Sequence, residues 1–206
     1  MTRSTTETTC KRYDRIAPFY DLMEAPVEKL RFSSWRKRLK DRITGERALE
    51  IGVGTGKNLP YYPSNMQITA IDLSPSMIVR ARKRAKALGL NVDLRQMDVQ
   101  ELDFPDKTFD TIFATFVFCS VPDPILGLRE LHRVCKPGGR LLLLEHMRPK
   151  TPLLSRFFDF LNPLILGITG ANINRRTIDN IHRAGWKIEA LNNLASDIVR
   201  WIEARP

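Results

Sequence analysis

Three glycines at alternate positions, directly after an apolar run, are the residues of this sequence that most clearly point to chemistry. The run at 48–51 is followed by Gly52, Gly54 and Gly56. Glycine has no Cβ, so its backbone reaches positive φ and can lie against a ligand. The pattern therefore predicts a strand followed by a loop that wraps around a nucleotide-like cofactor.

The spacing of the neighbouring residues narrows the choice of cofactor. A dinucleotide-binding loop reads G-x-G-x-x-G, whereas here the third glycine comes one residue early. A second apolar run ends at Asp72, 20 residues after Gly52, where an acid can accept hydrogen bonds from both hydroxyls of a ribose. An adenosine-containing ligand without a diphosphate fits these residues best.

Further motifs follow in register and resemble those of class I S-adenosylmethionine (SAM) dependent methyltransferases. Residues 96–110 are similar to the family's third-strand and fourth-strand region, where the acid corresponding to Asp98 binds the adenine amino group, and residues 134–141 match the turn into its fifth strand. The resemblance implies an enzyme that uses SAM. It also implies a set of cofactor-binding residues: Tyr20, Glu50, Gly52, Gly54, Gly56, Asp72, Met77, Asp98, Val99, Thr115 and Phe116.

Each motif taken alone also has a purely structural explanation. A glycine loop is about as often a tight turn as a ligand site. Asp72 lies next to a helix start at Ser74 and Pro75, and Asp98 by itself is a solvated loop acid. Four motifs in this order favour the cofactor site.

The elements that position these residues alternate between strand and helix. Apolar strand-like runs recur near 48–52, 67–72, 92–96, 110–117 and 139–146, and late strands are expected at 186–190 and 198–202. Helices are predicted over Pro75–Leu88, with Met77, Ala81, Ala85 and Leu88 on its apolar face, and over 177–184. We expect one domain over 1–206, an α/β doubly wound Rossmann-like sheet. In the resembled family this sheet has seven strands, with an antiparallel seventh between strands five and six.

Cysteine and histidine are scarce, which argues against several chemistries. Neither the cysteines Cys10, Cys119 and Cys135 nor the three histidines have the spacing of a metal or disulfide motif, so we expect no metal. Cys119 is read as a small hydrophobic residue rather than a nucleophile. The first residues lack the apolar core of a signal peptide, which predicts a cytoplasmic location.

The start of the chain resembles a lid. Residues 12–21 are similar to the amino-terminal segment shared by quinone C-methyltransferases and bacterial phospholipid N-methyltransferases. This implies that Tyr20 closes over the active site, where its ring face would attract the sulfonium of SAM or the ammonium of an acceptor. The alternative is an aromatic side chain that anchors a helix to the core, a reading that applies equally to Tyr13.

The net charge of the chain and an apolar segment near its carboxyl end indicate which class of methyl acceptor to expect. The formal net charge is +10, and six bases (Lys29, Arg31, Arg36, Lys37, Arg38 and Lys40) alternate with Leu30, Phe32, Trp35 and Leu39. Within an amino-terminal part at 1–45, this segment is expected either to lie on an anionic membrane or to form a solvated helix face. Residues 150–175 are expected to form an acceptor cap, whose apolar stretch is interrupted by Arg156, Asp159 and Pro163 and is a poor bilayer span. A plain pair of core helices is the alternative for this segment.

The resemblance implies methyl transfer to a lipophilic acceptor, and we expect the enzyme to be cytoplasmic and peripherally membrane-associated. Residues 119–122, 145–147 and 170–174 look most like the phospholipid N-methyltransferases, so the amine of phosphatidylethanolamine and its methylated intermediates is the first choice. Quinone C-methylation and small-thiol S-methylation are alternatives, and a non-catalytic SAM-binding membrane adaptor is the alternative outside enzymes. No nucleic-acid module is recognised.

An ammonium must lose a proton before it attacks, which makes Tyr20 and His146 the catalytic candidates. The oligomeric state is left open.

Overall fold

Seven strands form one mixed sheet. The structure, a computed structural model, describes residues 2–28 and 32–206. The strands are β1 (Arg47–Ile51), β2 (Gln67–Asp72), β3 (Asp93–Gln96), β4 (Phe109–Thr115), β5 (Cys135–His146), β6 (Lys187–Ala195) and β7 (Val199–Arg205). Their order is β3-β2-β1-β4-β5-β7-β6, with β1 to β5 parallel and β7 antiparallel to both neighbours. The expected doubly wound sheet, with its seventh strand between five and six, is confirmed.

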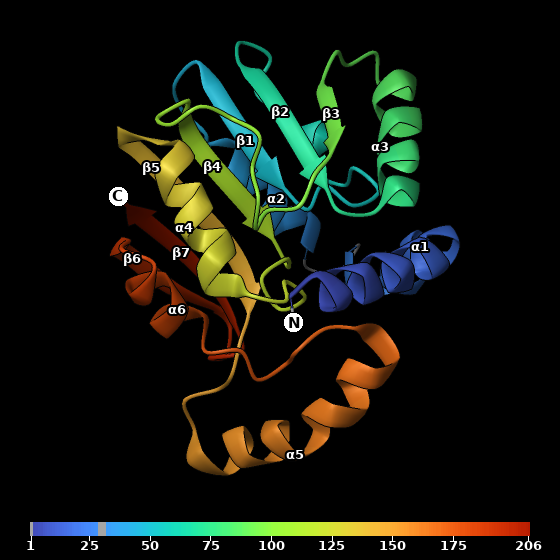
Figure 1. Cartoon of the computed structure of the whole chain (residues 1–206), viewed down its shortest axis with the longest axis vertical. Helices are drawn as coiled ribbons and strands as arrows, with labels where there is room; N and C mark the ends of the chain where they lie inside the picture. Colours follow the sequence, from blue (N-terminus) through green and yellow to red (C-terminus); the bar gives the residue numbers. More distant parts are fainter. Residues whose placement is uncertain (1, 29–31) are drawn as a thin grey trace.

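Helices cover both faces of this sheet and its carboxyl end (Figure 1). They are α1 (Thr2–Val27), α2 (Ser33–Lys40), α3 (Pro75–Ala87), α4 (Pro124–Val134), α5 (Pro152–Thr169) and α6 (Thr177–Arg183), with a short 3-10 helix at Leu59–Tyr61. The start of α3 follows local rules, because the Ser74 hydroxyl accepts the Met77 N–H and Pro75 is the first helical residue. Leu88, expected on the buried face of α3, is 45% exposed instead.

Alternate residues of the central strands pack into different layers. In β5, Leu141 and Leu143 belong to the cluster that includes α4 and α6, whereas Leu142 and Leu144 pack in the cluster with α2. All four side chains are fully buried. A continuous apolar run is what a parallel strand covered on both faces requires.

The basic segment around α2 does not turn its aromatic side toward a membrane. Trp35 and Leu39 are 8% and 2% exposed and pack in the same cluster as Phe113. Phe32 packs against that cluster as well. These apolar side chains therefore belong to the core, whereas Lys37, Arg38 and Lys40 are exposed. Lys29, Leu30 and Arg31 lie outside the described residues.

Two helices lie beyond the carboxyl ends of the parallel strands. In Figure 1, α1 crosses this end of the sheet and α5 stands below it, apart from the main body. Within the described ranges, none of the helices combines the length and the apolar character needed to cross a membrane.

Candidate functional site

A cavity opens at the carboxyl ends of β1, β2 and β4, under α1. This is the edge where ligands bind in open α/β sheets. Nine of the predicted site residues line it: Tyr20, Gly52, Gly54, Asp72, Met77, Asp98, Val99, Thr115 and Phe116. Thr9, Tyr13 and Ser120 also line it, and the sequence analysis did not assign them to the site. Glu50, Gly56 and His146 lie outside the lining.

The three glycines of the loop are required for three different reasons. A Cβ on Gly52 (φ +63°) would lie 2.5 Å from a methyl group of Val117, so this glycine allows close packing. A Cβ on Gly54 (φ +55°) would meet no atom nearer than 4.0 Å, because this glycine faces the cavity. A Cβ on Gly56 (φ +83°) would lie 2.5 Å from the Leu59 side chain. Gly56 therefore shapes the loop from behind rather than lining the cavity.

Asp72 joins the ends of β1 and β2. Its Oδ2 accepts the Gly54 N–H at 2.8 Å, and its Oδ1 accepts the Ser74 N–H at 2.9 Å. Burial raises the pKa of Asp72 to about 6, with the two backbone hydrogen bonds opposing this shift. Each carboxylate oxygen keeps a second lone pair, so the ionised group can accept two further hydrogen bonds from a ligand.

The helix α1 is tied to both sides of the cavity. On one side the Asp14 carboxylate accepts hydrogen bonds from the Ser74 hydroxyl at 2.5 Å and from the Ser76 N–H at 3.2 Å. On the other side the hydroxyls of Tyr13 and Ser120 hydrogen bond at 2.5 Å. The amino-terminal helix thus forms a roof over the cavity, and the Tyr13–Ser120 pair is part of the lining.

Glu50 supports the site without entering it. Its carboxylate is 1% exposed and accepts hydrogen bonds from the Asn58 amide at 2.5 Å and from the Tyr62 hydroxyl. Burial raises the pKa of Glu50 to about 7. The Asn58 amide also donates to Thr115 Oγ1 at 3.1 Å. Glu50 therefore connects the loop after β1 to the end of β4, and it lies outside the cavity lining.

A buried arginine extends this support to the amino-terminal segment. Arg36, 5% exposed, donates to Thr115 Oγ1 at 2.8 Å and to Asn58 Oδ1 at 2.9 Å. Its other side pairs with the Glu28 carboxylate at 3.0 Å. Sequence reasoning assigned Arg36 to a basic surface segment, whereas the structure makes it a link between the residue after α1 and the cavity wall.

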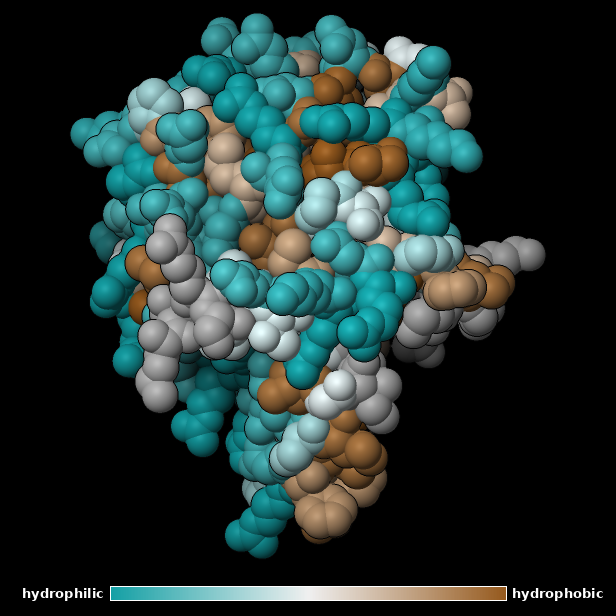
Figure 2. Space-filling view, turned by 45° about the vertical axis from the view of Figure 1, so that its right-hand side comes forward, coloured by the Kyte–Doolittle hydropathy of each residue, from teal (hydrophilic) through white to brown (hydrophobic). Residues whose placement is uncertain are grey.

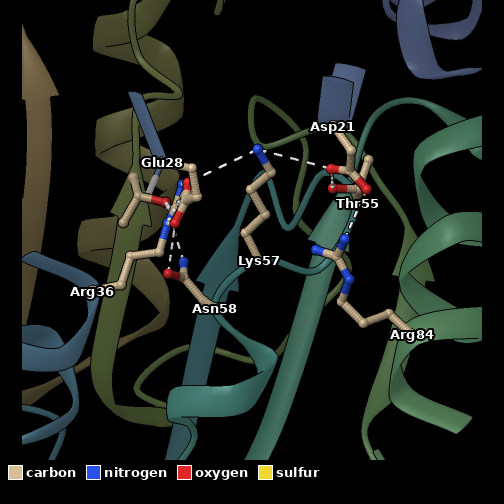
Figure 3. A network of polar contacts seen from close by, with 8 residues as sticks. Asp21, Glu28, Arg36, Thr55, Lys57, Asn58 and Arg84 are labelled. Carbon is tan, nitrogen blue, oxygen red and sulfur yellow. Dashed lines mark hydrogen bonds and ion pairs between the residues drawn. The ribbon is translucent and has the colours of Figure 1, made fainter. Parts of the chain in front are cut away.

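Lys57 and Asp21 complete the network of polar contacts around Arg36 and Glu28 that is shown in Figure 3. The Lys57 ammonium lies 3.8 Å from both Asp21 and Glu28, and 5.6 Å from the centre of the Tyr20 ring. Asp21 also accepts the Thr55 hydroxyl at 2.6 Å and pairs with Arg84 at 2.7 Å. Because Lys57 already occupies one face of Tyr20, a ligand cation can approach this ring only from elsewhere.

His146 lies behind the cavity wall. Its ring stacks on Phe116, with 6.1 Å between ring centres, and Phe116 lines the cavity. Burial lowers the pKa of His146, while the Glu145 charge acts in the opposite direction, so the imidazole is neutral near pH 7. A neutral imidazole can accept a proton. His146 itself lies outside the cavity lining.

The turn after β4 depends on another buried carboxylate. Phe116 has φ +59°, a conformation that is strained for a bulky residue. Glu145, fully buried on β5, accepts the Val117 N–H at 2.8 Å and the Phe118 N–H at 3.1 Å through Oε1. Burial raises the pKa of Glu145 to about 7. This carboxylate therefore holds Phe116 and Val117 in the cavity wall.

The residues after this turn are core residues. Phe118 and Cys119 are 1% and 2% exposed. Burial raises the pKa of the Cys119 thiol to about 12, so the thiol stays protonated and is a poor nucleophile. The interpretation of Cys119 as a small buried hydrophobic residue is confirmed.

Replacing Glu145 is expected to destabilise the turn in a graded way. Glu145→Ala leaves two buried N–H groups without a partner, a loss of about 2 to 4 kcal/mol, whereas Glu145→Gln keeps an acceptor oxygen and loses less. Since the folded-state pKa is raised from 4.5 to about 7, ionising Glu145 opposes folding as pH rises through this window. The stability of Glu145→Gln relative to wild type should therefore improve from about pH 4.5 to 7 in urea unfolding curves. Equal stability of Ala and Gln variants would contradict the assigned hydrogen bonds.

Comparison with known proteins agrees with the geometry of this site. A model of the methyltransferase domain matches residues 49–143. A phosphatidylethanolamine N-methyltransferase of Cereibacter sphaeroides is 47% identical over 112 residues, which are 53% of this chain and 55% of that protein. A ubiquinone/menaquinone biosynthesis C-methyltransferase of Cellvibrio japonicus is 38% identical over 168 residues, which are 77% of this chain and 67% of that protein.

A solved structure supports the same assignment at the level of fold. A SAM-dependent methyltransferase of Thermotoga maritima, described as a possible histamine N-methyltransferase, is similar with a TM-score of 0.71. The match covers 95% of this chain and 98% of that one at 21% sequence identity. From its fold and from the extent of its identity with curated methyltransferases, the chain belongs to the SAM-dependent methyltransferase family, with SAM as its methyl donor.

Proposed function

We propose that this enzyme methylates the amine of phosphatidylethanolamine and of its methylated intermediates. The observation that carries the proposal is the charge of the cavity wall. Its lining has two carboxylates, Asp72 and Asp98, and among the described lining residues no Lys or Arg. Such a wall favours positively charged contents. The sulfonium of SAM and the ammonium of a lipid amine both meet this condition.

Two relatives, each named for a different lipophilic substrate, support a lipophilic acceptor. The relative with 47% identity is named for phosphatidylethanolamine, but the match covers about half of each chain. Quinone C-methylation remains the second candidate, because the relative named for it matches 77% of this chain. Both acceptors are lipophilic. We therefore place the enzyme on the cytoplasmic side of a membrane, at an anionic surface.

The cavity residues suggest how SAM is held. Asp72 would accept the ribose hydroxyls, while Asp98 and Val99 would contact the adenine. Gly52 and Gly54 would lie against the cofactor, because the loop brings backbone rather than side chains to this wall. The wall residues Met77, Thr115 and Phe116 would complete the pocket, with the last two beside the methionine part. Glu50 and Gly56 would act by shaping the loop from behind.

SAM supplies an electrophilic methyl group, and the chain's residues supply alignment and proton control. An ammonium acceptor must be deprotonated before attack, and burial under α1 would lower its pKa by desolvation. Tyr20, Tyr13 and Ser120 line the cavity, and their hydroxyls would orient a neutral amine and pass its proton to water. We assign His146 the role of positioning Phe116.

The acceptor is tested by incubating the purified enzyme with SAM carrying a radiolabelled methyl group. Phosphatidylethanolamine vesicles, a demethylated quinone, total RNA and a small thiol are offered in parallel, each with SAM in excess. We expect label in the lipid, at the mono-, di- and trimethylated positions. Label in the quinone alone would replace the proposal with C-methylation, and label in none of them, with intact SAM binding, would favour an adaptor.

Asp72 is expected to make SAM binding pH-dependent. Its ionised form accepts the ribose hydrogen bonds, so SAM affinity should fall as pH drops through about 6, by up to about tenfold per pH unit. Asp72→Asn should lower affinity by about 1.5 to 3 kcal/mol at pH 7.5 and remove the pH dependence. Titration calorimetry measures both effects. The same affinity and pH profile in wild type and variant would exclude Asp72 from the ribose site.

The roles of Tyr20 and His146 are distinguished by substitution. Tyr20→Phe keeps the ring and should retain SAM binding while losing most methyl transfer, since only the hydroxyl is removed. His146→Ala should also retain SAM binding and lower transfer less, through Phe116. Tyr61→Phe, outside the cavity lining, is the matched control. Wild-type turnover in the Tyr20 and His146 variants would leave alignment alone as the source of catalysis.

A further inference from the structure

The helix α5 turns its apolar side away from the protein. Leu153, Phe157, Phe160 and Leu164 are 80%, 55%, 80% and 63% exposed. Their spacing of four, three and four residues puts them on one face of the helix. Figure 2 shows the hydrophobic patch at the lower end of the molecule, over α5. In a water-soluble helix this face would normally be the one that packs on the core.

Polar contacts fix α5 in this orientation. Its Asp159 pairs with Arg148 at 2.6 Å and accepts the Asn174 amide at 3.1 Å. Its Asn162 accepts the Ile173 N–H at 2.9 Å. These contacts tie α5 to the segments before and after it, on the side of the helix opposite the apolar stripe. The outward direction of the apolar stripe is therefore set by specific hydrogen bonds.

The helix α1 adds a similar surface beside α5. The two helices are in contact, since the Arg12 guanidinium donates to the Leu166 carbonyl at 3.3 Å. On α1, Phe19 and Leu22 are 63% and 76% exposed. Together with the four residues of α5 they form what we call the apolar rim. The rim borders the roof of the cavity, because Thr9, Tyr13 and Tyr20 of α1 line that cavity.

We propose that the apolar rim inserts into one leaflet of an anionic bilayer. This inference rests on the proposed function, because a lipid acceptor would have to enter the cavity from the leaflet. Exposed bases lie beside the rim, namely Lys11 and Arg15 on α1, Lys150 before α5 and Arg156 on it. The charge of Asp159 is neutralised by Arg148. An apolar stripe flanked by bases is the pattern that binds anionic interfaces.

The charge also argues against a second copy of this chain as the occupant. With a formal net charge of +10, two copies that met through the rim would bring their flanking bases together. An anionic lipid surface brings the opposite charge and an apolar layer at the same time. The docking surface is thus the α5 side of the molecule, not the α2 segment whose apolar residues are buried.

The test is sedimentation with vesicles of phosphatidylglycerol and phosphatidylcholine, or of phosphatidylcholine alone. Wild type should pellet with the anionic vesicles and less so as salt is raised. The double variant Phe157→Glu/Phe160→Glu should lose at least about tenfold in partitioning, because it puts charges where the stripe enters the leaflet. Val79→Glu is the matched control, since Val79 on α3 is also 63% exposed but far from the rim in sequence. It should pellet like wild type.

Three results would overturn the proposal. The first is that the double variant partitions into vesicles like wild type, and the second is that the Val79 control loses as much partitioning as the double variant. The third is that wild type sediments as a dimer and the double variant as a monomer in sedimentation velocity, while neither binds vesicles. The last result would identify a second copy as the occupant. Circular dichroism and thermal unfolding confirm that the variants are folded; both substituted residues are exposed, so little change is expected.

A second measurement separates docking from the proposed function. Methyl transfer is assayed with phosphatidylethanolamine in vesicles and with a short-chain form that stays monomeric in solution. The double variant should lose transfer to vesicles and keep transfer to the monomer. If wild type methylates neither lipid but the double variant still loses vesicle binding, the docking surface stands and the acceptor assignment fails. Loss of transfer to both lipid forms in the double variant would instead mean that the rim acts on catalysis rather than on docking.

Discussion

Buried carboxylates at the carboxyl ends of parallel strands hold the loops that make the cavity. Glu50 in β1 accepts hydrogen bonds from Asn58 and Tyr62, Asp72 in β2 from Gly54 and Ser74, and Glu145 in β5 from Val117 and Phe118. Burial raises the pKa of all three. A buried acid without such donors would be strongly destabilising. These hydrogen bonds therefore hold the loops in the arrangement that forms the cavity.

This arrangement leaves one of the three acids available to a ligand. Asp72 lines the cavity, whereas Glu50 and Glu145 lie outside its lining. The same division holds for the glycines, since Gly54 faces the cavity and Gly56 packs on Leu59. Cofactor contact and support of the loop are thus separate tasks, carried by neighbouring residues of the same motif.

The amino-terminal helix connects the cofactor loop to the proposed membrane-facing side. Through Asp21 and the residue after the helix, Glu28, it is linked to Lys57 and Arg36, and so to the cavity wall. Through Arg12 it contacts α5. A change in how α5 and α1 meet a lipid surface would therefore act on the same helix that covers the cavity.

The sequence by itself predicted the strands and helices of the sheet from local patterns, and its resemblance to SAM-dependent methyltransferases implied the cofactor and nine of the residues that line the cavity. Glycine spacing, an acid at the end of an apolar strand and helical periodicity each depend on residues close together in the chain. Periodicity states which residues share a face of a helix, but not which way that face turns. Only the tertiary structure showed that Trp35 and Leu39 face the core, while Phe157 and Phe160 face outward. It also placed Glu50 and His146 behind the cavity, since their partners Tyr62 and Phe116 reach them only through the packing of separate loops and strands.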